Sequence, residues 1–370
     1  MTDLSFPSAP DLVTPAWLTS VLRDAGAIGK ANVRSLSTER VGEGVGFVGQ
    51  IARITPEYDR AESGAPPTLI GKFAAANEAG RQIAATYGLY RCEVNFYREV
   101  AGAISLRTPC CYFSTMNDDA TEFVLLLEDL SATGRLGDQV AGCTLNEARL
   151  ALAELATLHA SWWQHHELDG MSWLPLLTEL GKTSATEAYP QNWEPCLERF
   201  GHLLSPEIRH AAPSLDEGLM ALMTRFEKMP HTIVHADYRL DNLFFGRSGS
   251  DYELAVIDFQ IACRGAAAYD VAYFIGLNLD TEVRRQSEGA LLEHYHRALV
   301  KHGVKDYSLD RLQGDYVFSI LAYLGAAIAN ATTLDPANER GEELFALLLG
   351  RSAAAVMDLR ALDALPQGGR

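Results

Sequence analysis

His235-Ala236-Asp237-Tyr238-Arg239-Leu240-Asp241-Asn242 is the most informative stretch of this sequence, together with Ile257-Asp258-Phe259-Gln260 a short distance after it. A hydroxyl group that accepts a phosphoryl group needs a carboxylate to take its proton, and nucleotide-bound magnesium needs hard oxygen ligands. Asp237, Asn242 and Asp258 supply a carboxylate, a side-chain amide and a second carboxylate, in that order. The pattern therefore predicts a phosphoryl-transfer centre.

The spacing of these residues supports the same prediction. Asp237 and Asn242 are close enough in sequence to lie on one loop. The apolar runs 243–245 and 254–257 flank a polar, glycine-bearing segment, which predicts two strands and a turn that return Asp258 to this loop. The alternative is a solvated loop followed by a buried strand with an acidic residue there by chance. Three such pieces in this order favour the phosphoryl-transfer centre.

Length and composition set the limits of the prediction. A chain of 370 residues with 48% hydrophobic residues is long enough for two lobes with substantial cores. Its net charge of −17 argues against non-specific binding to nucleic acid or to an anionic membrane surface, because both usually need a basic surface. Neutral or cationic small molecules fit this charge more easily.

The sequence also predicts a location and a redox state. No uninterrupted apolar segment reaches membrane-spanning length, and residues 1–7 lack the positive start and apolar core of a secretory signal, so the cytoplasm is the expected location. The six cysteines show neither paired metal-ligand spacing nor the density of a disulfide scaffold. Reduced thiols are therefore expected.

The pattern of apolar residues divides the chain into two parts. The sequence up to about Thr115 is rich in strand patterns around one helical stretch, Glu78 to Ile104, and most of the chain after it has helical periodicity. Glu122 to Leu130 has the pattern of a buried strand that connects the two parts. We expect an N-terminal nucleotide-binding lobe over residues 1–128 and a C-terminal catalytic and substrate-binding helical lobe over residues 129–370.

A glycine-rich segment lies in the first part. Gly44, Gly46 and Gly49 form a G-x-G-x-x-G pattern, which lets backbone amides approach phosphate groups. A strand pattern follows Gly49 where a dinucleotide-binding fingerprint would have a helix, so the context favours a loop over ATP. The alternative is an ordinary glycine-rich hairpin turn.

Lys72 lies near the end of an apolar strand, where a lysine needs solvent or a charged partner. Glu93 is a candidate partner if Phe96 and Tyr97 place its helix face inward. In that arrangement the lysine would contact the nucleotide phosphates and the glutamate would orient it. The alternatives are a surface lysine beside an ordinary helix glutamate, and a pair with Glu78 at the start of the helix.

These motifs together resemble the aminoglycoside phosphotransferase and choline kinase-like superfamily, over nearly the whole chain. Glu93 to Tyr97, Leu127 to Leu130 and Ile257 to Gln260 are most similar to its ecdysteroid kinase-like branch. The resemblance implies an α+β, protein-kinase-like two-lobed fold, with an antiparallel sheet and one helix in the small lobe and mainly helices in the larger one.

The resemblance also implies roles for individual residues. It implies ATP and Mg²⁺ as cofactors, Asp237 as the catalytic base, and Asn242 and Asp258 as magnesium ligands. It further implies Lys72 and Glu93 as the phosphate-orienting pair, and Glu128 to Leu130 as the adenine-binding segment, acting through its backbone.

The sequence departs from protein kinases at two positions. Gln260 replaces the glycine that follows Asp258-Phe259 in protein kinases, so a glycine-dependent flip of this segment is not expected. Arg239 stands where protein kinases have a lysine; it could brace the transferring phosphoryl group or pair with Asp241 or solvent. Asp270 is expected to cap a helix and brace the Asp237 loop.

The acceptor is the least determined part of the prediction. The segment from Ser161 to Phe200 is rich in aromatic residues, which could form the wall of a pocket or belong to the core. A steroid-like or other apolar alcohol, an amino alcohol and an aminoglycoside all remain open. A second hypothesis is a catalytically silent nucleotide-binding or scaffold protein. Kinase activity on proteins is disfavoured, because the interval from Asp258 to Asp270 is too short for a long activation segment.

Overall fold

The computed structural model describes residues 6–41, 49–183, 188–331 and 339–365, which form two compact units. Unit 1 comprises Met1–Arg135 and Gly246–Ile261, and unit 2 comprises Leu136–Phe245 and Ala262–Arg370. The sequence boundary at 128 would place 246–261 with the helical part. In the structure these residues belong to unit 1, where Val256 N donates to Arg107 O at 2.9 Å and Arg247 N donates to Thr133 O at 2.8 Å.

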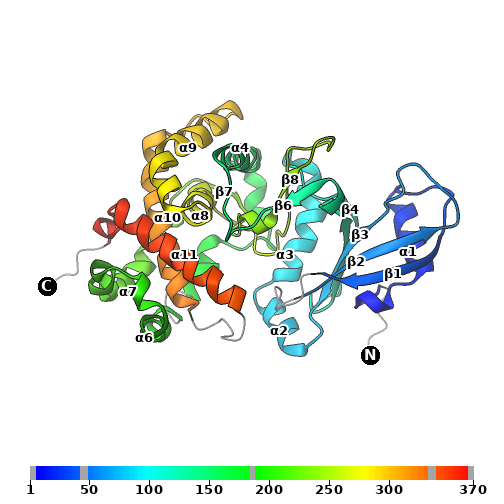
Figure 1. Cartoon of the computed structure of the whole chain (residues 1–370), viewed down its shortest axis with the longest axis horizontal. Coiled ribbons are helices and arrows are strands. Elements are labelled where there is room, and N and C mark those ends of the chain that lie inside the picture. Colours follow the sequence, from blue (N-terminus) through cyan, green and yellow to red (C-terminus); the bar gives the residue numbers. More distant parts are fainter. Residues whose placement is uncertain (1–5, 42–48, 184–187, 332–338, 366–370) are drawn as a thin grey trace. The chain divides into compact units, whose positions relative to one another are not determined.

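Unit 1 is built on a five-stranded antiparallel sheet (Figure 1). Its strands are β1 (Val33–Arg40), β2 (Gly49–Tyr58), β3 (Leu69–Ala74), β4 (Cys111–Met116) and β5 (Phe123–Glu128). Their order in the sheet is β1-β2-β3-β5-β4, so β3 pairs with β5 although residues 75–122, which include β4, separate the two strands in sequence. The short strand β9 (Leu254–Val256) also belongs to this unit.

Three helices accompany the sheet, and they differ from the single helical stretch expected over 78–104. That stretch is divided into α2 (Glu78–Thr86) and α3 (Leu89–Asn95) because Gly88 between them has a φ of +67°, a left-handed conformation that ends a helix. A π-helical turn, Phe96–Val100, continues α3. The third helix, α1 (Pro15–Asp24), was not predicted, although its start has a Thr14 N-cap and a proline at the first position.

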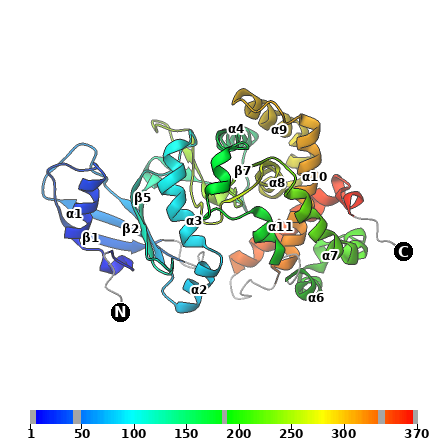
Figure 2. The same ribbon diagram turned by 180° about the vertical axis from the view of Figure 1, so that it is seen from behind.

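The two faces of the sheet carry different helices, and Figures 1 and 2 show α1 and α3 on opposite sides of it. Side chains alternate between the faces along a strand. Leu69 and Phe73 of β3 pack with Val124 and Leu126 of β5 in the core on the α1 side. Lys72 therefore points to the other face, toward α3.

Unit 2 is mainly helical, as expected. Its helices are α4 (Leu145–Ser161), α5 (Leu177–Thr183), α6 (Tyr189–Phe200), α7 (Pro206–Phe226), α8 (Ala267–Asn278), α9 (Thr281–Lys301), α10 (Leu309–Ala329) and α11 (Glu339–Asp358). The antiparallel strands β7 (His231–Val234) and β10 (Cys263–Ala266) pair within it. Two short strands, β6 (Gly134–Leu136) and β8 (Leu243–Gly246), span the points in the sequence where one unit gives way to the other. The α+β fold class with an antiparallel sheet and a helical part is confirmed.

Polar side chains fix the starts of several unit 2 helices. Thr144 and Glu147 form a capping box at the start of α4, in which each side chain accepts a hydrogen bond from the other residue's backbone amide. Ser205, Asp280 and Ser308 cap the starts of α7, α9 and α10. Each does so through a single hydrogen bond, which its side-chain oxygen accepts from a backbone N–H of the first turn. These caps set the ends of the helices around α8.

Helix α10 is long and apolar enough by composition to cross a membrane, which the sequence analysis did not expect of any segment. In the structure 67% of its most apolar window is buried inside the protein. Its apolar side chains pack largely against other helices of unit 2, with Ile320, Leu321 and Leu324 fully buried. The helix is therefore a core helix of this unit.

Candidate active site

Lys72, Glu93 and Asp258 form one cluster in unit 1; the pairing of Lys72 with Glu93 was predicted, whereas the contact of Lys72 with Asp258 was not. Lys72 Nζ lies 2.5 Å from Glu93 Oε1 and 3.1 Å from Asp258 Oδ1. Lys72 reaches the cluster from β3, Glu93 from α3, and Asp258 from the segment after β9. Glu78 is not the partner of Lys72; it lies 3.8 Å from Arg81 instead.

The cluster is electrostatically unbalanced, because two carboxylates share one ammonium group. Burial acts to lower the pKa of Lys72, but attraction to Asp258 and Glu93 outweighs it and leaves this pKa above its usual value. Burial raises the pKa of Glu93, and the Lys72 ammonium offsets part of this increase. Lys72 is therefore held in its charged form, beside one buried carboxylate and one more exposed carboxylate.

The backbone around Asp258 is held in an unusual conformation. Asp258 has a φ of +66°, in the left-handed region that non-glycine residues seldom adopt. The next residue, Phe259, stacks on Phe96 with ring centroids 3.6 Å apart, and its carbonyl accepts from Cys92 Sγ at 3.3 Å. These two contacts with α3 and its π-helical turn fix the segment, so the Asp258 carboxylate is presented to Lys72.

The other residues predicted to bind the nucleotide are two described residues of the β5 end, Glu128 and Leu130, and the glycines of the G-x-G-x-x-G pattern. Gly44 and Gly46 lie outside the described residues, and Gly49 is the first residue of β2. Glu128, at the end of β5, accepts two hydrogen bonds from Arg107 Nη2, at 2.9 and 2.8 Å. Both of its carboxylate oxygens are therefore already paired with an arginine. Leu130 is buried and begins a short 3₁₀ helix. An adenine contact in this segment would therefore be made by its backbone.

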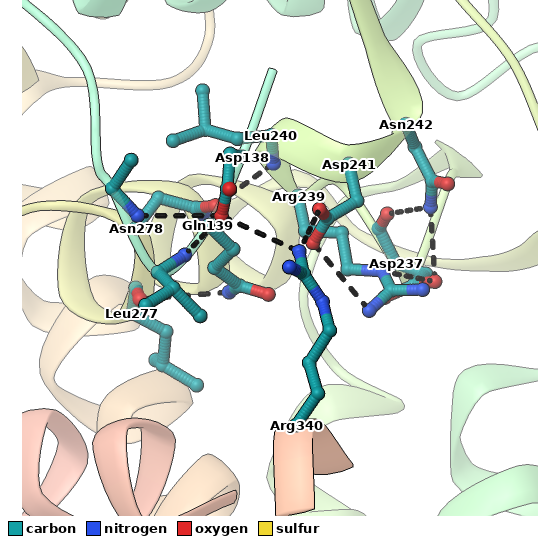
Figure 3. A network of polar contacts seen from close by, with 12 residues as sticks. Asp138, Gln139, Asp237, Arg239, Leu240, Asp241, Asn242, Leu277, Asn278 and Arg340 are labelled. Carbon is teal, nitrogen blue, oxygen red and sulfur yellow. Dashed lines mark hydrogen bonds and ion pairs between the residues drawn. The ribbon is translucent and has the colours of Figure 1, made fainter. Parts of the chain in front are cut away.

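Asp237 and Asn242 lie on one loop of unit 2, after β7 (Figure 3). Asn242 Nδ2 donates to Asp237 Oδ2 at 3.0 Å and to the backbone oxygen of Asp237 at 2.9 Å. Both donated bonds use the amide nitrogen, so the amide oxygen of Asn242 is directed elsewhere. The loop thus brings together the carboxylate and the amide that the sequence predicted.

Arg239 contacts both neighbouring carboxylates of this loop. Its Nε lies 3.2 Å from Asp237 Oδ2, and its Nη1 lies 3.8 Å from Asp241 Oδ2. The pairing with Asp241 is one of the alternatives left open by the sequence, while the pairing with Asp237 was not foreseen. Arg239 places a positive charge directly beside the predicted base.

Asp270 braces the Asp237 loop from α8. Its fully buried carboxylate accepts from His235 N at 2.7 Å and from Ala236 N at 2.8 Å. Ala236 has a φ of +65°, a left-handed conformation that costs about 1 kcal/mol for a residue with a β-carbon, and the bond to Asp270 holds it there. The bracing role agrees with the sequence prediction. Asp270 does not cap α8, however, because the residue at the N-cap is Ala266.

Further buried groups extend this brace. His159 of α4 lies 3.2 Å from Asp270 Oδ2 through Nε2 and 2.8 Å from the hydroxyl of Tyr295 through Nδ1. The ring of His235 accepts a 3.2 Å bond from Asp237 N, so His235 is a structural hydrogen-bonding residue, as expected. Helices α4, α8 and α9 thus all support the loop.

Replacing Asp270 by asparagine is expected to lower the free energy of unfolding by about 2 kcal/mol. The amide group of asparagine has one acceptor oxygen, so one of the two backbone N–H groups of the loop would face an NH₂ group without a partner. Chemical denaturation followed by far-UV circular dichroism measures this change, with Asp251→Asn at an exposed turn as the control. An unchanged denaturation midpoint would show that Asp270 does not support the loop.

Sequence reasoning missed two groups in the surroundings of the Asp237 loop, Tyr273 and Arg340. Tyr273 of α8 lies close to Asp237, and burial together with the Asp237 carboxylate raises the pKa of Tyr273. Arg340, at the start of α11, reaches Asp241 and Asp138 (Figure 3). The spacing from Asp270 to Tyr273 was the available signal for the tyrosine, whereas Arg340 has no local motif.

The aromatic segment 161–200 belongs largely to the core. Trp162, Trp173 and Tyr189 are each less than a tenth exposed. Trp163 is partly exposed, and its indole N–H donates to Asp306 at 3.2 Å. A different group of aromatic rings neighbours Asp237: Tyr323 of α10 stacks on Tyr269 at 4.3 Å and meets the edge of Tyr273 at 5.0 Å.

The candidate metal ligands are hard oxygen donors, the amide oxygen of Asn242 and the carboxylate of Asp258, which suit Mg²⁺. Within the described parts of the chain, no three His, Cys, Asp or Glu side chains are grouped as a metal site. Magnesium in nucleotide sites usually takes one or two protein ligands, with phosphate oxygens and water for the rest. Asn242 in unit 2 and Asp258 in unit 1 each therefore offer a donor of the type that suits a metal carried with the nucleotide.

Comparison with known proteins gave a family and several relatives. The model of the ecdysteroid kinase-like family matches residues 43–306. Homoserine kinase from Caulobacter vibrioides (strain NA1000 / CB15N) is 29% identical over 134 residues, which are 35% of this chain and 42% of the relative. The match thus spans less than half the length of that relative.

Solved structures resemble the whole chain. Choline kinase from Cryptosporidium parvum Iowa II has a TM-score of 0.57 at 11% identity, covering 93% of this chain and 98% of that one. Ethanolamine kinase from Plasmodium vivax has a TM-score of 0.56 at 12% identity, covering 94% and 89%. At these identities the likeness concerns the fold.

Proposed function

Because the chain belongs to the ecdysteroid kinase-like family, we propose that it transfers the γ-phosphoryl group of magnesium-bound ATP to a hydroxyl group of a small molecule. The observation that supports this most is the loop in which Asn242 holds the Asp237 carboxylate through its amide nitrogen. A fixed carboxylate beside a magnesium-type oxygen ligand is what transfer to an alcohol requires.

Asp237 would act on the acceptor. Its carboxylate takes the proton of the acceptor hydroxyl as the new bond between oxygen and γ-phosphorus forms, and the bond from phosphorus to the ADP oxygen breaks. Arg239, beside Asp237, is placed to brace the charge of the transferring group. The tight bond from Asn242 keeps the carboxylate in one orientation, so little reorganisation is needed.

Lys72, Glu93 and Asp258 would act on the nucleotide. Lys72 carries its charge to the phosphates, and Glu93 fixes its position from the buried side. Asn242 and Asp258 would hold the metal, which when bound neutralises charge on the phosphates. The backbone of Glu128 to Leu130 would contact the adenine, and Gly44, Gly46 and Gly49 would cover the phosphates.

The second candidate is a nucleotide-binding protein without catalytic activity. An ATP-consumption screen against apolar and steroid-like alcohols, amino alcohols and aminoglycosides separates the two, because only the kinase consumes ATP in response to an acceptor. Nucleotide binding is checked first by thermal shift: ATP and magnesium at a hundred times their dissociation constant should stabilise the protein by about 2.7 kcal/mol. Stabilisation without turnover across the panel would support the silent protein, and no stabilisation would contradict both.

A further inference from the structure

Arg340 belongs to a series of alternating charges that begins at the predicted base Asp237 and ends at Asp138 (Figure 3). Asp237 contacts Arg239, and Arg239 contacts Asp241. Asp241 Oδ1 lies 3.9 Å from Arg340 Nη2, which lies 3.6 Å from Asp138 Oδ1. Arg340 comes from α11, far along the sequence from the loop, and its side chain is 62% exposed.

The contacts of Arg340 are weak. Both distances exceed the range of a direct hydrogen bond, and exposed ion pairs of this length contribute little. Among the described residues, these two carboxylates are the charged partners of Arg340. A guanidinium group has five N–H donors in a rigid planar fork, which suits a carboxylate better than two distant oxygens.

The carboxylates around Arg340 are held more firmly than Arg340 itself. Asp138 Oδ1 accepts from Val140 N at 2.9 Å, so part of its capacity is used within its own turn. Arg351 fixes the backbone beside it by donating to Gln139 O at 3.1 Å and to Leu277 O at 2.8 Å. Asp241 has Arg239 as a second cationic partner. Among the described residues, the group in this network with hydrogen-bonding capacity left over is therefore the guanidinium of Arg340.

We propose that Arg340 recognises a carboxylate on the acceptor, so that the preferred substrates are hydroxylated carboxylic acids. This inference rests on the proposed function, because it places the acceptor hydroxyl at Asp237. The acceptor carboxylate would replace the long contacts to Asp138 and Asp241 with a bidentate pair. Asp241 would keep Arg239 as its partner, and Asp138, which is partly exposed, would keep the hydrogen bond from Val140 N.

Binding of matched probes tests this directly. Two series are used, one with 4-hydroxybutanoate, its amide and 4-aminobutan-1-ol, and one with lithocholate and its corresponding amide and amine. Isothermal titration calorimetry should show that each carboxylate binds the wild-type protein about tenfold or more tightly than its amide, in at least one series. Arg340→Gln should remove this preference without weakening the amide, and Arg340→Lys should retain part of it. Arg149→Gln, which removes one exposed charge from α4, should leave the preference intact.

Three results would overturn the inference: no carboxylate preference in either series, equal weakening of carboxylate and amide by Arg340→Gln, or tightest binding of the amines. Tightest binding of the amines would show that Asp138 and Asp241 form a site for a cationic group of the acceptor. The experiment measures binding, so it is independent of turnover. If no acceptor is phosphorylated but the preference for carboxylates depends on Arg340, the proposed kinase activity fails while the recognition site stands.

Discussion

Replacing Asp237 by asparagine is expected to lower kcat by about three orders of magnitude and to leave the dissociation constant for magnesium-ATP unchanged. The substitution keeps the size of the side chain and an acceptor oxygen for Asn242 Nδ2, but removes the group that takes the acceptor proton. It also removes the negative charge beside Arg239, so that Arg239 should pair with Asp241 alone. Initial rates under saturating acceptor, with nucleotide binding measured separately, give both quantities.

The control for Asp237→Asn is Asp251→Asn, because Asp251 is an exposed carboxylate outside both clusters. The control should keep kcat within about twofold, and both variants should keep the thermal midpoint of the wild type. If Asp237→Asn retained most of its turnover, Asp237 would be a structural residue of the loop and the assignment of the base would be wrong. A loss of nucleotide affinity in the same variant would place Asp237 at the metal.

The sequence predicted those parts of the molecule whose residues lie close together in the chain. Asp237 and Asn242 are five residues apart, so one loop is enough to bring them together. The pairing of Lys72 with Glu93 was predicted because a lysine near the end of an apolar strand needs a charged partner, and because helix periodicity can turn Glu93 inward with Phe96 and Tyr97. The family resemblance drawn from these motifs is confirmed by the match over residues 43–306.

The parts that were missed depend on contacts between distant segments. Arg340 stands almost a hundred residues after Asp241, and nothing in its own neighbourhood in the sequence distinguishes it from other surface arginines. The break between α2 and α3 was missed because helical periodicity continues through Gly88, and only its left-handed φ reveals the interruption. The aromatic segment 161–200 shows a related limit, since burial depends on which helices pack together, which composition does not reveal.

Asp258→Asn is expected to weaken the binding of magnesium-ATP by about a hundredfold while changing the binding of metal-free ATP little. Asparagine is the informative substitution because Asp258 has a φ of +66°, a conformation that asparagine adopts at a lower cost than alanine. The change therefore removes the charge and leaves the backbone of the segment in place. Titration with magnesium at fixed ATP, followed by calorimetry, measures the metal-dependent part of the affinity.

The Asp258→Asn substitution also tests how much each of the two carboxylates, Glu93 and Asp258, contributes to holding the Lys72 ammonium. Two carboxylates share the Lys72 ammonium, so removal of the Asp258 charge leaves Lys72 paired with Glu93 alone. Folding stability should change little, because one buried pair with a 2.5 Å contact remains intact. The matched variant Glu93→Gln should behave in the opposite way, with a clear loss of stability, because Glu93 is the buried partner and the less buried Asp258 replaces it poorly. An unchanged magnesium titration for Asp258→Asn would show that Asp258 only partners Lys72, and the metal would then have to be held by Asn242 and the nucleotide without it.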